Sequence, residues 1–171
     1  MGEMDNRPAF TGLIVYRSPV YRYSFLYPDG WHPAELAEIR GQRVLLVPAT
    51  EDALTGVIVE ARDLGTIVSG DDLPSLRRGF LAGLRQFRRS SVESQEEYVI
   101  GDLIGLEARQ TYHEDNVRRR RWVRLLYHRS TQVCLTARGG TVEQFEYWLP
   151  MFNQIMRTFR FGDWWAEITS Q

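Results

Sequence analysis

The stretch Tyr21-Arg22-Tyr23-Ser24-Phe25-Leu26-Tyr27-Pro28-Asp29-Gly30-Trp31 is the part of the chain that decides its fold. Aromatic residues occupy every second position from Tyr21 to Tyr27, and this alternation is typical of a strand with one face turned to a core. Pro28-Asp29-Gly30 predicts a turn, because proline presets φ and glycine allows positive φ. We therefore expect a buried aromatic strand with Trp31 packed under it.

Apolar runs on both sides of this stretch indicate further elements. A strand is expected to begin around Leu13, and residues 43–48 and 56–61 have the composition of buried strands. Residues 72–89 are predicted to form a helix, because apolar residues recur at spacings of three and four. The stripe comprises Leu73, Leu76, Phe80, Leu84 and Phe87, with Asp71 and Asp72 at its start and Arg85, Arg88 and Arg89 in its last turns.

The second half of the chain predicts a run of strands and a final helix. Strands are expected at about 93–99, 102–112, 117–128 and 131–137, and short polar connections between them are typical of an antiparallel meander. Residues 141–160 are predicted to form a helix that Thr141 and Gln144 begin as a capping box and Pro150 kinks or splits. Strands in runs, rather than alternating with helices, favour an α+β fold with an antiparallel sheet.

Residues 21–31 resemble the signature of the PsbP-like fold, in which an aromatic strand leads through Tyr-Pro to a tryptophan. A last helix closing in phenylalanine, here Phe152 to Phe159, agrees with it, as does the order of the elements between. The fold is shared by the extrinsic PsbP subunit of photosystem II, the small Ran-binding import factor Mog-one and many bacterial proteins. The resemblance covers about residues 10–161 and implies a central antiparallel sheet sandwiched between helices.

The same resemblance assigns the chain to the bacterial branch of the fold, whose members share no common activity. Its named relatives act by binding other proteins, so the resemblance implies binding rather than catalysis. Fold analogy alone does not transfer a specific role, and the chain shows neither a Ran-binding nor a photosystem motif. The expected organisation is a flexible leader at 1–9, a single domain at 10–161 and an aromatic C-terminal tail at 162–171.

Composition fits one globular domain. The chain has 171 residues, 43% hydrophobic and 25% charged, and a net charge of −1, so electrostatic recognition requires a local patch. Cys134 is the one cysteine, which excludes a disulfide within the chain. No signal-peptide pattern and no apolar run of membrane-spanning length is present, so we expect a cytoplasmic protein, unless an export leader has been removed.

The sequence carries no catalytic, cofactor or metal signature. His113-Glu114-Asp115 is the one cluster of metal-ligating types, and adjacent residues of a strand point to opposite faces. Cys134 lies inside a predicted strand, where packing explains it better than nucleophilic chemistry does. Gly139-Gly140-Thr141 precedes a helix but lacks phosphate-loop spacing. We expect no enzyme, no cofactor and no metal.

Two basic surfaces and the tail are the candidate contact sites. Arginines on the predicted helix 72–89 avoid its apolar stripe, and those of strand 117–128 alternate around Trp122, with Arg119 and Arg121 on the other face. Arginine beside an aromatic ring can bind phosphate and stack a base, but solvated charged faces look the same in sequence. The tail tryptophans either cover the domain itself or anchor a partner. The candidate partner-binding residues are Arg78, Arg85, Arg89, Arg118, Arg120, Trp122, Arg124, Trp164 and Trp165.

These observations favour a non-catalytic binding or assembly protein that acts through protein contacts. The expected partner is an acidic protein or a second copy of the chain, and the slightly negative total charge disfavours nucleic acid. The alternative is a small-ligand carrier with a pocket between sheet and helix, lined by Tyr21, Tyr23 and Tyr27.

Overall fold

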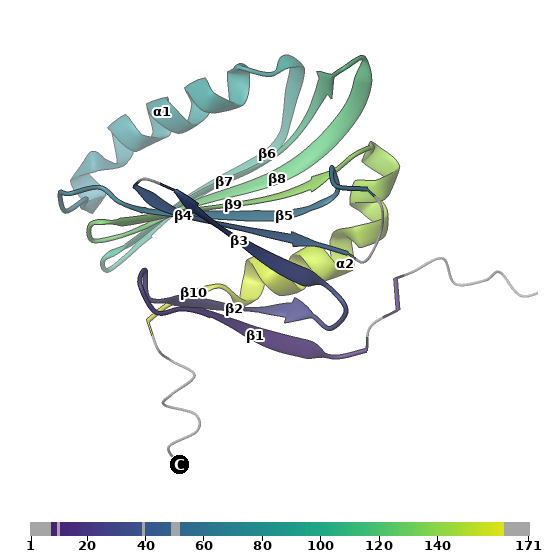
Figure 1. Cartoon of the computed structure of the whole chain (residues 1–171). Coiled ribbons are helices and arrows are strands. Elements are labelled where there is room, and N and C mark those ends of the chain that lie inside the picture. The colour runs from purple at the N-terminus through teal and green to yellow at the C-terminus, as the bar shows by residue number, and fades with distance from the viewer. Residues whose placement is uncertain (1–7, 10, 39, 49–51, 163–171) are drawn as a thin grey trace, which may run out of the picture.

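The computed structural model describes residues 8–9, 11–38, 40–48 and 52–162 and arranges them as two antiparallel sheets and two helices (Figure 1). The large sheet has seven strands, in the order β3 (His32–Glu38), β4 (Gly41–Val47), β5 (Gly56–Asp63), β9 (Thr131–Gly139), β8 (Val117–His128), β7 (Leu103–Glu114) and β6 (Arg88–Ile100). The small sheet has the order β1 (Leu13–Ser18), β2 (Tyr23–Pro28) and β10 (Arg160–Phe161). The helices are α1 (Leu73–Arg85), entered through a 3-10 turn at Gly70–Asp72, and α2 (Val142–Thr158).

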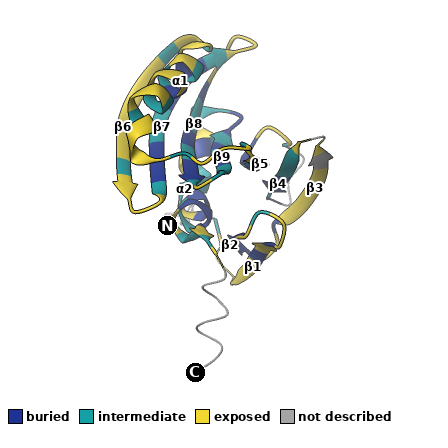
Figure 2. Ribbon diagram, turned by 90° about the vertical axis from the view of Figure 1, so that its left-hand side faces the viewer, coloured by how far each residue is buried: buried dark blue, intermediate teal, exposed yellow. Residues whose placement is uncertain are grey.

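The helices lie on opposite faces of the large sheet. In Figure 1, α1 lies above the sheet, and α2 and the small sheet lie below it. The lower core joins α2 to β2, β5, β8 and β9, with Phe25, Phe145 and Phe152 fully buried. The upper core is smaller and sets Phe80 and Leu84 of α1 against β7 and β8. Figure 2 shows that β3 and β6, the two edge strands, are mostly exposed.

The aromatic stretch behaves as its alternation predicts. Tyr23, Phe25 and Tyr27 are buried on β2, and Tyr23 and Phe25 stack on Tyr16 of β1. Trp31 is 5% exposed and meets Trp148 and Phe152 of α2 edge to face. Tyr21 differs from expectation, because it lies in the turn before β2 and is only half-buried.

The first predicted helix is too long at its C-terminus. The structure ends α1 at Arg85, and Arg88 and Arg89 already belong to β6, where Arg88 pairs with His113 of β7. Arg89 adopts a φ of 47°, in the left-handed region, at an irregularity in this pairing. The pairing of β6 with β7 thus prevails over the apolar spacing that placed Phe87 in the helix. The prediction that Arg88 and Arg89 lie in the last turn of the helix, near the negative end of its dipole, is wrong.

The second predicted helix is nearly right. Thr141 caps α2, and its hydroxyl accepts a hydrogen bond from the Gln144 backbone N–H at 3.1 Å. The Gln144 side chain does not complete the capping box and points toward Thr55, with its oxygen 3.3 Å from the Thr55 hydroxyl, which donates to Asp52 at 2.6 Å. Pro150 is exposed and does not split α2, which runs unbroken to Thr158.

The meander of β6, β7, β8 and β9 is confirmed, and β8 has the predicted bounds. Two strands were not predicted, the edge strand β3 and the two-residue β10. The α+β class with a central antiparallel sheet is therefore correct. The large sheet is only partly sandwiched between helices. One of its faces is covered by α2 together with the small sheet, and on the opposite face α1 covers only strands β6 to β8. Residues 1–7 and 163–171 lie outside the described part, so the leader and tail remain predictions.

We expect Phe25→Ala to lower the free energy of unfolding by about 3–5 kcal/mol, because it opens a cavity where β2, α2 and the large sheet meet. Urea denaturation followed by circular dichroism measures this loss. Val20→Ala is the matched control, since Val20 is 76% exposed and its truncation should change stability by less than about 0.5 kcal/mol. Equal effects of the two substitutions would contradict the assignment of the core.

Candidate functional site

The upper face of the large sheet is covered over only part of its width. Phe80 and Leu84 of α1 cover β7 and β8, whereas Leu45, Ile58 and Thr136, on the same face of β4, β5 and β9, are half-buried. The register continues this face outward, with Leu125 opposite Cys134, Cys134 opposite Glu60 and Glu60 opposite Arg43. The uncovered strands thus present a row of side chains to solvent beside the helix.

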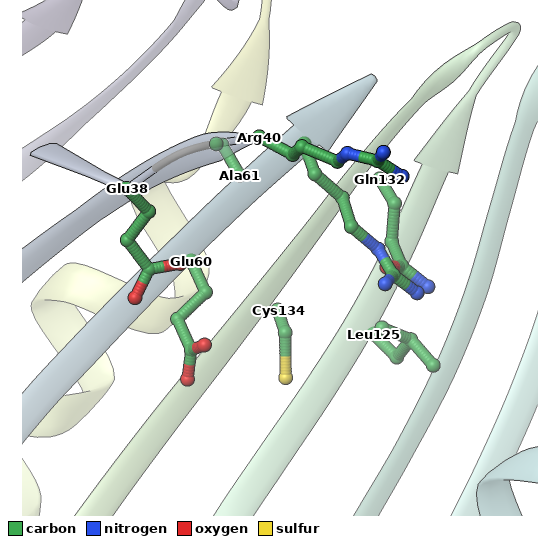
Figure 3. Close-up of a pocket in the computed structure, with 9 residues that line it drawn as sticks. Glu38, Arg40, Glu60, Ala61, Leu125, Gln132 and Cys134 are labelled. Carbon is green, nitrogen blue, oxygen red and sulfur yellow. The ribbon is translucent and has the colours of Figure 1, made fainter. Parts of the chain in front are cut away.

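This row forms the floor of a groove, which we call the sheet groove. One hollow of about 880 Å³ is lined by Glu38, Arg40, Gly41, Glu60, Ala61, Arg62, Leu125, Gln132 and Cys134 (Figure 3). A second hollow of about 540 Å³ lies between the floor and α1 and shares five of these residues. In Figure 3, the carboxylates of Glu38 and Glu60 lie on one side of Cys134, and Arg40 and Gln132 lie on the other.

The charges of the sheet groove are unevenly paired. Arg43 holds both carboxylates, with Nη2 3.2 Å from Glu38 and 3.3 Å from Glu60. All three side chains are more than a third exposed, so each pair contributes at most about 1 kcal/mol. Arg62 donates a hydrogen bond to the Gln132 side chain, and neither Arg62 nor Arg138 forms an ion pair within the described residues. Arg40, Arg43 and Arg62 stand against Glu38 and Glu60, which leaves one excess positive charge at the groove, and Arg138 lies on the same sheet face beyond the lining.

Cys134 lies half-buried at the centre of the floor. Burial raises the pKa of its thiol to about 11, so the thiol stays protonated at neutral pH. A nucleophilic cysteine requires a lowered pKa. The sulfur lies 3.9 Å from the Thr136 hydroxyl, which is a packing contact with a weak hydrogen bond. Cys134 is thus a floor residue of the sheet groove.

The helix wall of the groove is made of small residues. Ser75, Gly79 and Gly83 of α1 line the second hollow. A Cβ atom added at Gly79 or Gly83 would meet no atom within 4 Å, so the space beside the helix is open. Glycine in a helix interior costs about 1 kcal/mol relative to alanine. A methyl group at either position would narrow the groove without a steric clash.

The predicted basic patches are dispersed by the fold. Arg78 and Arg85 are exposed on α1 but do not line the sheet groove, and Arg77 of the same helix pairs with Glu97. Arg118 is exposed, and Arg89 lies with Arg88 beside the β7–β8 turn.

The arginines around Trp122 alternate as predicted but are largely neutralised. Arg120 pairs with Glu93 at 3.2 Å and with Glu146 of α2. The guanidinium of Arg124 lies 3.1 Å from Glu107 and donates to Tyr98 Oη at 2.9 Å. Trp122 is 2% exposed and packs in the lower core. Trp164 and Trp165 fall outside the described residues.

The aromatic pocket expected between sheet and helix does not coincide with the sheet groove. Tyr23 and Tyr27 pack in the lower core, where burial raises the pKa of Tyr23. Sequence reasoning missed the groove residues Arg43, Glu60 and Arg62. The sequence did contain a signal for them. Polar residues at alternate positions of a strand indicate that one face of that strand is exposed to solvent.

His113, Glu114 and Asp115 lie at the β7–β8 turn, where Glu114 and Asp115 approach Arg119 at 3.4 and 4.0 Å. In the part of the chain that the structure describes, no group of three or more His, Cys, Asp or Glu side chains is placed to hold a metal ion. Within the same residues, neither helix has the length and apolar character of a membrane span.

Comparison with known proteins places the fold. No family model matches the chain, and the search of curated proteins finds no match. Cyanobacterial PsbP (CyanoP) from Synechocystis sp. PCC 6803 is similar at a TM-score of 0.62 and 14% identity, over 90% of this chain and 94% of that one. The Saccharomyces cerevisiae Ran-binding protein Mog1p is similar at a TM-score of 0.54 and 8% identity, over 89% and 96%. The chain therefore has the PsbP-like fold.

A crystal structure from Bacteroides thetaiotaomicron gives a TM-score of 0.53 at 14% identity, and the match covers 87% of this chain but only 48% of that one. At such identities the similarity defines the fold, and the chemistry of the site has to come from the residues of this chain.

We expect Cys134 to react with a disulfide reagent roughly a hundredfold more slowly in the folded protein than in urea at about pH 8, because a pKa near 11 leaves few thiolates. The rate should keep rising with pH toward 11, since the reactive species is the deprotonated one. Absorbance of the released thiol measures both rates. A folded-state rate equal to that in urea would show an exposed, ordinary thiol.

Proposed function

We propose that the chain is a non-catalytic binding or assembly protein, and that it docks an acidic segment of a partner protein in the sheet groove. The observation that carries this proposal is the uncovered part of the upper sheet face, where Arg62 and Arg138 lie without ion-pair partners among the described residues. Apolar side chains lie on the same face, with Leu36 50% exposed and Leu45 and Ile58 half-buried.

Charge favours an acidic occupant. The two groove glutamates share Arg43, and Arg40 and Arg62 add two further positive charges to the lining. Beside the groove on the same sheet face, Arg138 lies directly opposite Arg121 of β8. Like charges directly opposite each other in a sheet are unfavourable. Arg121 is stacked on Phe87, with its guanidinium carbon 3.9 Å from the ring centroid, and donates to Gln110. Carboxylates from a partner would neutralise these arginines in and beside the groove and form charge-assisted hydrogen bonds.

The shape of the groove favours a protein segment over an enclosed small ligand. The two hollows join along the strands and open to solvent rather than closing around a cavity. Small-ligand sites usually enclose most of the ligand surface. One protein of the same fold, Mog1p, is a Ran-binding protein, which supports recognition of proteins as a use of this fold without carrying Ran to this chain.

We expect Arg62→Glu combined with Arg138→Glu to weaken capture of a protein partner from native lysate at least about tenfold, because two reversed charges oppose an acidic segment. Each bait carries a photo-crosslinking residue at position 58, so that mass spectrometry identifies whatever contacts the groove floor. Gly83→Leu is the second test, because it adds an apolar side chain to the helix wall of the groove without changing its charge.

The matched control is Arg78→Glu with Arg85→Glu, which reverses two exposed charges of α1 outside the groove. Retained crosslinking in this control, with loss in both groove variants, supports the proposal. Loss only in the control would move the contact to the outer face of α1. Loss only in a separate Trp164→Ala/Trp165→Ala bait would move it to the tail. A crosslink to the chain itself would identify a second copy as the partner.

A further inference from the structure

A second cleft lies on the opposite face of the large sheet, beside the C-terminal half of α2. It has a volume of about 400 Å³ and is lined by Ser94, Glu96, Glu107, Arg109, Trp122, Arg124 and Arg157. We call it the Trp122 cleft. It shares no residue with the sheet groove, so it is a separate site.

The meander and α2 build this cleft together. Ser94, Arg109 and Trp122 are direct cross-strand neighbours on β6, β7 and β8, so they share one face. Glu96, Glu107 and Arg124 form the next row in the same way. The last turn of α2 then brings Arg157 over Trp122 from the other side of the cleft.

Two guanidinium groups gather at one indole ring. The guanidinium carbon of Arg109 lies 4.6 Å from the centroid of the Trp122 ring, and that of Arg157 lies 5.9 Å from it. Within the described residues neither arginine forms an ion pair, and the Asn153 side chain, 3.4 Å away, accepts from Arg157 Nε. The ring attracts each cation, but the two like charges repel each other, and an anion that reached both would offset this repulsion.

The acidic residues of the cleft do not supply that anion. Glu107 is held by Arg124 at 3.1 Å, and Arg124 also donates to Tyr98 and to the carbonyl oxygen of Met156. Glu96 is exposed on the edge strand β6 and forms no ion pair within the described residues. Three arginines against two glutamates leave the lining with an excess positive charge.

The indole N–H of Trp122 lies inside the core beside the cleft. This Nε1–H is buried and has no hydrogen-bond partner within the described residues. An unpaired buried donor is costly, and protein atoms cover this one, so it can report on the cleft without contacting an occupant. A nucleobase would need the ring face for stacking, whereas the two guanidinium groups already lie close to that ring. These observations favour a small anion over nucleic acid.

We propose that the Trp122 cleft binds an oxyanion, held by Arg109 and Arg157 beside the ring of Trp122. The chemistry suits a free phosphate and a carboxylate equally, because guanidinium groups bind both. This binding does not depend on the proposed docking of a protein segment in the sheet groove.

The test follows the indole N–H resonance of Trp122 in two-dimensional NMR while inorganic phosphate is titrated into the full chain, with Trp122→Phe to assign the signal. We expect a saturable shift of this resonance in the intact protein. Arg109→Gln combined with Arg157→Gln should weaken the binding at least about tenfold, because it removes two charge-assisted contacts. Arg78→Gln with Arg85→Gln is the control with the same loss of charge on the other face, and it should bind as the intact protein does.

A parallel titration with acetate separates the two sources of the anion. Saturation by phosphate alone indicates a phosphate site, and saturation by acetate alone indicates a site for a carboxylate side chain; either result supports the proposal. An indole resonance that neither anion shifts overturns it. So does a shift that sodium chloride reproduces at equal ionic strength, or one that persists unchanged in the Arg109/Arg157 variant.

Discussion

The rest of the structure depends on the burial of β2 between α2 and the large sheet. The strand pairs along its whole length with β1 but with only two residues of β10 on its other side. The backbone N–H of Leu26 is satisfied instead by the hydroxyl of Thr158, at 2.9 Å, so the end of α2 takes the place of a longer strand. Buried backbone donors require partners, so this hydrogen bond fixes the position of α2 against the small sheet. The two elements enclose the aromatic core as one layer.

The open part of the upper face follows from that arrangement. Because α2 covers the lower face together with the small sheet, the upper face has only the 13-residue α1. A helix is about 10 Å wide, whereas seven strands span roughly 29 Å, so one helix cannot cover the sheet. The uncovered strands carry Arg43, Glu60 and Arg62 at alternate positions, which keeps this face from becoming an apolar patch.

Sequence reasoning succeeded where the controlling interactions are local. The alternation around Phe25, the turn at Gly30 and the cap at Thr141 each depend on neighbours within a few residues, and all are present. It failed where a distant partner decides. His32–Glu38 contains no β-branched or large aromatic residue typical of strands, and it becomes a strand by pairing with β4.

The candidate sites show the same limit. Alternation on β8 correctly separates Arg120 and Arg124 from Arg119 and Arg121, but the sequence does not show which acids neutralise them. Glu93 of β6 and Glu146 of α2 both pair with Arg120. Glu93 lies at an irregularity in the β6–β7 pairing, between Val92 and Ser94. Arg109 and Arg157 lie 48 residues apart in sequence, and only the crossing of α2 over the meander brings both to Trp122.

Both candidate sites have their floors on strands of the same sheet, and β8 contributes to each. Leu125 faces the sheet groove, and Trp122 and Arg124 face the cleft on the other side. Side chains on paired central strands are held by the ladder on both sides, whereas loop residues must be ordered when a ligand binds. Recognition at either site would therefore begin from a preformed surface, which reduces the entropic cost of binding. The same rigidity separates the two sites, because neighbouring residues of β8 point to opposite faces and cannot contact one occupant.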